Sequence, residues 1–153
     1  MYCKKFIIDN PEKKDCFEYA LCTPVENGKK FSIIPKERKE VFLRIKIDKG
    51  LLLEIDNDTK KCDYGFIRNV NSDFYFVELK GIDIDSAVKQ LVSTILIFRR
   101  KYGISAEKTF AYIVSSGLPR AANQKFQKLQ ENFIKSKMGV ELKKQTNHFQ
   151  LYV

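Results

Sequence analysis

Two acidic residues and one lysine lie at the ends of two neighbouring apolar segments, at a spacing that suits phosphodiester chemistry. Asp63 begins the first segment, and Glu78 and Lys80 end the second, which spans residues 74–80. The intervening residues 68–73 are rich in Asn, Ser and Asp, the residue types that turns recruit. We therefore expect a β-hairpin that carries all three charged side chains.

Two turn positions are compatible with this hairpin. A reversal at residues 70–71 places position 63 across from position 78, whereas a reversal at residues 71–72 places it across from position 80. Because strand side chains alternate with a period of two, Asp63 shares a face with Glu78 and Lys80 in either register.

Hydrolysis of a phosphodiester needs groups of these types. Water must be driven onto an anion, so the negative charge that builds up on the phosphoryl oxygens has to be neutralised. Mg²⁺ does this from one or two protein carboxylates and keeps its other positions for water and phosphate. A lysine at the same place steadies the developing charge or lowers the pKa of the attacking water. Asp63, Glu78 and Lys80 are close to the smallest set that suffices.

The Glu-x-Lys tripeptide does not identify the site by itself. It occurs four times, beginning at Glu12, Glu37, Glu78 and Glu141. The longer string Val-Glu-Leu-Lys is present at both 77–80 and 140–143. The first copy follows a hydrophobic strand, has an Asp on its hairpin partner and precedes a helix. The second copy follows Gly139 and is expected to form a surface strand.

This context resembles the PD-(D/E)XK nuclease superfamily, whose members have the restriction-endonuclease-like fold. The resemblance covers roughly residues 45–115. Asp63 matches the metal-binding Asp of the family, and Glu78 and Lys80 match its acid-x-Lys pair. Gln90 lies one helical stretch later, where several nuclease branches place a Gln that contacts the site or the substrate.

The resemblance implies a fold and a metal site. The fold is an α/β domain over residues 1–153, with a mixed β-sheet flanked by helices and with residues 1–40 as an extension. Asp63 and Glu78 would bind Mg²⁺ or Mn²⁺ together with the carbonyl oxygen of Leu79. Family members often add a Glu from an N-terminal helix, but the first forty residues predict no such helix here.

The resemblance also implies an activity. Lys80 would assist the attacking water or stabilise the transition state of a metal-dependent nuclease, endonuclease-like and acting on DNA rather than RNA. A homodimer is an expectation from the same resemblance, because restriction-like enzymes often pair to cut two strands. One branch of the family follows its Gln four residues later with Tyr, where this chain has Thr94.

The charge of the chain favours a polyanionic partner. Lys and Arg number 28 against 19 acidic residues, which gives a formal net charge of +9. Nucleic acid is the commonest partner of such a surplus. Arg120, Lys125 and Lys128, on a predicted helix, are candidate phosphate contacts, although a solvated helix face explains them about as well. The sequence contains no apolar run long enough for a membrane span and no signal-peptide core, so we expect a cytoplasmic protein without a membrane partner.

The sequence lacks the residue patterns of several other kinds of functional site. The cysteines at positions 3, 16, 22 and 62 form no Cys-x₂-Cys pair, and the chain has a single histidine, His148. A structural zinc site and a Ser-His-Asp or Cys-His site are therefore not expected. No glycine-rich loop for a nucleotide precedes a predicted helix.

Periodicity predicts the elements that position these residues. Apolar runs and alternation predict strands at 41–47, 51–55, 63–68, 74–80, 108–114 and 149–153. Helical spacing predicts helices over 84–101 and 119–137. Asp83 or Asp85 would cap the first helix, and Gly103 would end it. The apolar stripe of the second helix is Ala122, Phe126, Leu129, Phe133 and Ile134. Residues 1–35 are expected to be strand or loop, with a short helix over 17–21.

Two other functions remain compatible with the same residues. The first is a catalytically inactive module of the nuclease fold that binds nucleic acid or a protein partner. The second is a protein-interaction or inhibitor domain, in which Asp63, Glu78 and Lys80 form only a cross-strand ion pair.

Overall fold

The computed structural model describes residues 2–52, 60–79 and 82–153, which form an α/β fold with two sheets. A six-stranded sheet has the order β1-β3-β4-β5-β6-β7. Its strands are β1 Phe17–Tyr19, β3 Phe42–Lys46, β4 Tyr64–Arg68, β5 Phe74–Leu79, β6 Thr109–Ser115 and β7 Glu141–Thr146. A two-stranded sheet pairs β2 Lys30–Ile34 with β8 His148–Tyr152.

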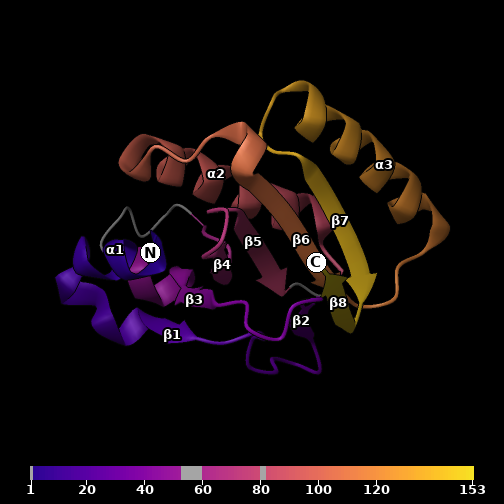
Figure 1. Ribbon diagram of the computed structural model, residues 1–153. Coiled ribbons are helices and arrows are strands. Elements are labelled where there is room, and N and C mark those ends of the chain that lie inside the picture. Colours follow the sequence, from indigo (N-terminus) through magenta and orange to yellow (C-terminus); the bar gives the residue numbers. More distant parts are fainter. Residues whose placement is uncertain (1, 53–59, 80–81) are drawn as a thin grey trace.

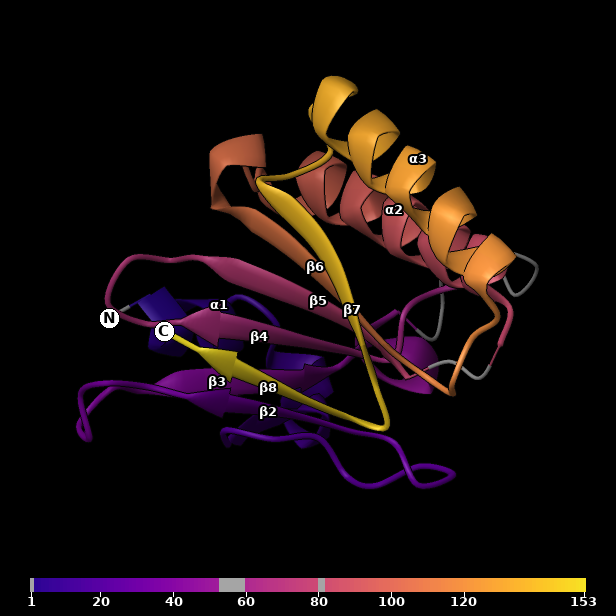
Figure 2. The same cartoon turned by 90° about the vertical axis from the view of Figure 1, so that its right-hand side faces the viewer.

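Helices cover one face of the larger sheet. The α-helices are α1 Tyr2–Ile8, α2 Ile84–Tyr102 and α3 Arg120–Lys135, and three short helical turns are Pro11–Cys16, Ile47–Leu51 and Ala106–Lys108. Figure 2 shows α2 and α3 side by side over this face, with β2 and β8 on the opposite side of the sheet. An apolar core fills the space on each side of the six-stranded sheet, so the centre of this sheet is buried on both faces.

The sheet is mixed, as expected. Strands β3, β4 and β5 form an antiparallel meander, after which α2 crosses over to β6, which is parallel to β5. Helix α3 makes the second crossover, to β7, which is parallel to β6. The strands along this path are visible in Figure 1. The second Val-Glu-Leu-Lys copy begins one residue before β7, which lies at one edge of the sheet, and its Leu142 is buried.

The hairpin between β4 and β5 has the first of the two predicted registers. Tyr64 pairs with Val77 and Ile67 with Phe74, and the Arg68 N–H donates to the Asp73 carbonyl oxygen at 2.9 Å. This pairing centres the reversal on residues 70–71. Alternation along β5 then sends Phe74 to the helix-covered face and Val77 to the opposite face.

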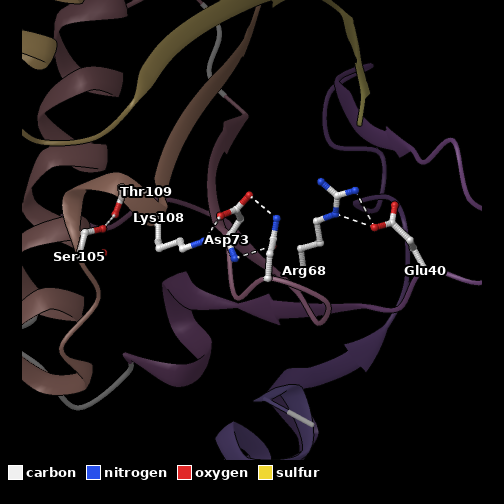
Figure 3. A network of polar contacts seen from close by, with 7 residues as sticks. Glu40, Arg68, Asp73, Ser105, Lys108 and Thr109 are labelled. Carbon is white, nitrogen blue, oxygen red and sulfur yellow. Dashed lines mark hydrogen bonds and ion pairs between the residues drawn. The ribbon is translucent and has the colours of Figure 1, made fainter.

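A polar network holds the turn end of the hairpin (Figure 3). The Arg68 guanidinium forms an ion pair with Glu40 at 2.6 Å, and both side chains are largely buried. On the other side of the turn, the Asp73 carboxylate accepts a hydrogen bond from Asn71 at 2.8 Å and forms an ion pair with Lys108 at 3.5 Å. The network lies at the opposite end of β5 from Glu78.

The boundaries predicted for α2 are confirmed within one residue. The Asp83 side chain accepts a hydrogen bond from the Ser86 N–H at 3.0 Å, which caps the start. Gly103 ends the helix in the left-handed conformation, with φ of 67°. Helix α3 also lies within its predicted range, but Ile134 is 46% exposed. The reason is that consecutive helical residues differ by about 100° in direction, so Ile134 points away from the row of Phe133.

Two of the N-terminal predictions were wrong, although residues 30–34 form a strand as the expectation of strand or loop allows. Residues 2–8 form α1, which buries Cys3 and Phe6 against the sheet, whereas residues 17–19 form a strand that pairs antiparallel with β3. The strand predicted over 51–55 is also wrong where it can be seen, because Leu51 belongs to a helical turn; residues 53–55 lie outside the described part of the chain. These segments are short, so tertiary contacts override their local pattern.

Within the described ranges, no helix is both long and apolar enough to cross a membrane.

Candidate functional site

Asp63 and Glu78 lie opposite each other at the ends of β4 and β5. Tyr64 pairs with Val77, so the next step of the antiparallel register places Asp63 across from Glu78. The Leu79 N–H donates to Asp63 Oδ2 at 2.8 Å, which joins the two strand ends and orients this carboxylate. The structure thus brings together the two acids that the sequence singled out.

Both carboxylates belong to the helix-covered face of the sheet. Glu78 has the same parity as Phe74 and Phe76, which pack in the core beneath α2. The Glu78 side chain is buried, with a relative exposure of 2%, whereas Asp63 is half-buried. Acidic residues are almost never so fully buried unless they are paired or coordinate a metal.

The pKa of the Cys62 thiol is affected by the negative charges of both carboxylates. Burial raises the pKa of this thiol well above its usual range, and the negative charges of Glu78 and Asp63 raise it further. Both carboxylates therefore lie close enough to this buried sulfur atom to act on its pKa.

Gln90 of α2 reaches the same place. Its side-chain amide donates to the Lys61 carbonyl oxygen at 3.3 Å. One turn later, Thr94 Oγ1 accepts a hydrogen bond from the Cys62 N–H at 2.9 Å and donates to the Gln90 carbonyl oxygen at 2.7 Å. Thr94, which stands where one family branch has Tyr, thus fastens α2 to the backbone that precedes Asp63.

Two residues near the pair were missed by the sequence analysis. Lys61 is buried, with a relative exposure of 6%, although a lysine is rarely so enclosed. Strand alternation gave no signal here, because Lys61 precedes β4 and the neighbouring Cys62 packs on the opposite side of the sheet from Tyr64, two residues later. Ser115 is the second: β6 pairs its Ile113 with Glu78, and Ser115 lies two residues further on the same face. The Ser115 hydroxyl is buried and has no hydrogen-bond partner within the described residues.

The remaining predicted site residues have different outcomes. Lys80 lies outside the described residues. Arg120, Lys125 and Lys128 are exposed on α3. Lys125 forms an ion pair with Asp85 in the first turn of α2, and the hydrogen bond from this pair raises the pKa of Lys125. The structure therefore ties the N-terminal half of α3 to the start of α2, while Arg120 and Lys128 remain solvent-facing.

The donor set suits a hard divalent cation. Among the described residues, no group of three or more His, Cys, Asp or Glu side chains is placed to hold a metal ion. Helix α1, Tyr-Cys-Lys-Lys-Phe-Ile-Ile, contains no acidic residue, so it does not supply the additional Glu of the family pattern. Two carboxylates, Asp63 and Glu78, are nevertheless enough for Mg²⁺, which keeps several waters and takes one or two protein carboxylates.

Comparisons of the chain with protein-family models, with curated proteins and with solved structures return no match.

Proposed function

We propose that the chain is a metal-dependent nuclease that hydrolyses phosphodiester bonds, in DNA rather than RNA. The observation that carries this proposal is the pair Asp63 and Glu78, opposed at the ends of two adjacent central strands, with Glu78 in the interior. A purely structural cross-strand pair would more commonly be exposed, since the burial of charge is costly.

Each residue of the proposed site would have a separate role in metal binding or in hydrolysis. Asp63 and Glu78 would hold the cation, with the Leu79 carbonyl oxygen as a third ligand by family resemblance. A bound Mg²⁺ would supply the positive charge that stabilises negative charge on the phosphoryl oxygens. The Leu79 N–H orients the Asp63 carboxylate, and Lys80 would assist the attacking water.

The charge of the chain supports a nucleic acid substrate. The formal net charge is +9, and residues 119–144 contain one Arg and six Lys against two Glu, a net of 7 − 2 = +5. This segment includes the exposed Arg120 and Lys128 of α3. Basic side chains on one face provide the phosphate contacts that position a nucleic acid.

The test compares two glutamates in the same tetrapeptide. We expect Glu78→Gln to lower cleavage of single- or double-stranded DNA by about 100-fold or more, because loss of a metal ligand removes several kcal/mol of charge stabilisation. Glu141→Gln is the matched control: Glu141 accepts a hydrogen bond from Tyr112 and pairs with Lys143 at the sheet edge. Cleavage of DNA and RNA oligonucleotides is measured in Mg²⁺, Mn²⁺ and EDTA.

Two results would contradict the proposal. One is a wild-type protein that cleaves none of these substrates in either metal. The other is Glu78→Gln cleaving as fast as wild type while both variants remain folded by circular dichroism.

A second candidate is the catalytically inactive module of the same fold, which binds nucleic acid or a protein partner. The observation that favours it is the short donor set, because α1 contributes no acid and the described residues contain no third carboxylate beside Asp63 and Glu78. Calorimetry with Mn²⁺ separates the two candidates. Metal binding that Glu78→Gln abolishes supports the nuclease, and its absence in wild type supports the inactive module.

A further inference from the structure

A hollow of about 480 Å³ opens along the first three turns of α2. Basic and hydroxyl side chains line it: Lys60, Ser86, Lys89 and Ser93. Gln90 also lines the hollow, as do the acidic residues Asp83 and Asp85. Ammonium and hydroxyl groups are hydrogen-bond donors, so the lining suits a ligand that is rich in acceptor oxygens.

The two acidic residues of the hollow are already engaged. Asp85 forms an ion pair with Lys125 of α3, and Asp83 accepts the capping hydrogen bond from the Ser86 N–H. In contrast, Lys60 and Lys89 are exposed, and neither forms an ion pair within the part of the chain that the structure describes. Among the described residues, the hollow therefore presents two lysines that form no ion pair, beside one carboxylate, Asp83, that forms none either.

Gln90 connects the hollow to the carboxylate pair. The same side-chain amide that lines the hollow donates to the Lys61 carbonyl oxygen at 3.3 Å. Lys61 and Asp63 are two residues apart, so their Cα atoms are at most about 7 Å apart. A chain molecule held at Asp63 and Glu78 would thus reach the hollow with its next unit.

We propose that this hollow binds a backbone phosphate of the nucleic acid strand, adjacent to the phosphodiester that is cut. Lys60 and Lys89 supply the charge, and the Ser86 and Ser93 hydroxyls supply further donors. This inference rests on the proposed nuclease function for the identity of the neighbouring phosphodiester. The occupant is one phosphate of one strand, so the contact requires no duplex.

The test uses the double variant Lys60→Ala/Lys89→Ala. Binding of a fluorescent single-stranded DNA is measured by anisotropy in EDTA over a series of salt concentrations, and cleavage is measured in Mg²⁺. We expect weaker binding, with a slope of log K against log [salt] that is smaller in magnitude by about 0.7, the value for one phosphate contact on a single strand. In DNA cleavage by the double variant, we expect KM to rise and kcat to be retained, because Asp63 and Glu78 are intact. Lys101→Ala, an exposed lysine in the last turn of the same helix, is the control and leaves both unchanged.

The outcomes separate this inference from the proposed function. If the double variant binds and cleaves as wild type does while Glu78→Gln is inactive, the hollow is not a phosphate site and the nuclease proposal stands. If wild type binds DNA without cleaving it and the salt slope of the double variant is smaller in magnitude by about 0.7, the phosphate site stands and the nuclease proposal fails. A loss of affinity confined to oligonucleotides with a terminal phosphate overturns the assignment to an internal phosphodiester.

Discussion

At the scale of single residues, Glu78 shows a conflict between stability and function. A carboxylate that is 2% exposed loses most of its hydration, and the charge of Asp63 lies across the hairpin from it. The apolar side chains that flank it in β5 would accommodate a hydrophobic residue at lower cost. The burial of Glu78 beside a second acid is the observation on which the proposed cation site rests.

At the other end of β5, the buried Tyr75 makes the stability of the folded protein depend on pH in the alkaline range. Burial raises the pKa of Tyr75 from 10.0 to about 12, and the charge of Asp73 raises it as well. The unfolded chain loses this proton near pH 10 while the folded protein retains it. Stability therefore falls between pH 10 and 12, by about 3 kcal/mol from this residue. We expect Tyr75→Phe to lose less stability than wild type over that range.

Urea unfolding at pH 8, 10 and 11 measures this difference. Since other buried groups also titrate in this range, the comparison is between the slopes of the two proteins and not between their absolute stabilities. Equal slopes for wild type and Tyr75→Phe would contradict the assignment.

At the scale of elements, the hairpin of β4 and β5 depends on a close approach at Gly65. A Cβ atom at this position would lie 2.7 Å from Phe74 Cε1 and 3.0 Å from Ile47 Cδ1. We expect Gly65→Ala to lower the free energy of unfolding by about 1–3 kcal/mol, the usual cost of overpacking a core. Gly117→Ala is the matched control, because no atom lies within 4 Å of a Cβ built there.

Thermal denaturation followed by circular dichroism compares the two glycine variants. If Gly65→Ala melts at the same temperature as Gly117→Ala, the strand has enough freedom to absorb the methyl group, and the packing argument is wrong.

Elements with a strong local pattern could be predicted from the sequence. The hairpin follows from its turn residues and its two apolar runs, and α2 follows from its apolar spacing between Asp83 and Gly103. The segments 2–8 and 17–19 were assigned wrongly because each is shorter than a stable isolated element. Their structure depends on packing against the sheet, which no local pattern encodes.

At the scale of the whole molecule, the proposed metal site should couple to global stability. A cation that binds only the folded state stabilises it by about 2.7 kcal/mol at a concentration of 100 times Kd. For a domain of this size, that corresponds to a rise in Tm of about 5–10 °C. We expect Mn²⁺ to raise the Tm of wild type and of Glu141→Gln, and to leave that of Glu78→Gln unchanged.

Melting curves with Mn²⁺ and with EDTA provide the measurement. An equal rise in all three proteins would mean that the cation binds elsewhere, and no rise in any of them would agree with the inactive module.

The sequence alone determined that Asp63 shares a face with Glu78, because strand side chains alternate with a period of two in either predicted register. The structure decided which of the two registers forms, and so set Asp63 across from Glu78. Only the tertiary structure decided that Lys61 is buried, that Gln90 reaches the Lys61 carbonyl oxygen and that Gln90 also lines a hollow together with Lys60 and Lys89. These contacts join residues 29 positions apart through the crossover of α2 onto the sheet. Their geometry is set by how the helix packs on the sheet, which neither periodicity nor spacing specifies.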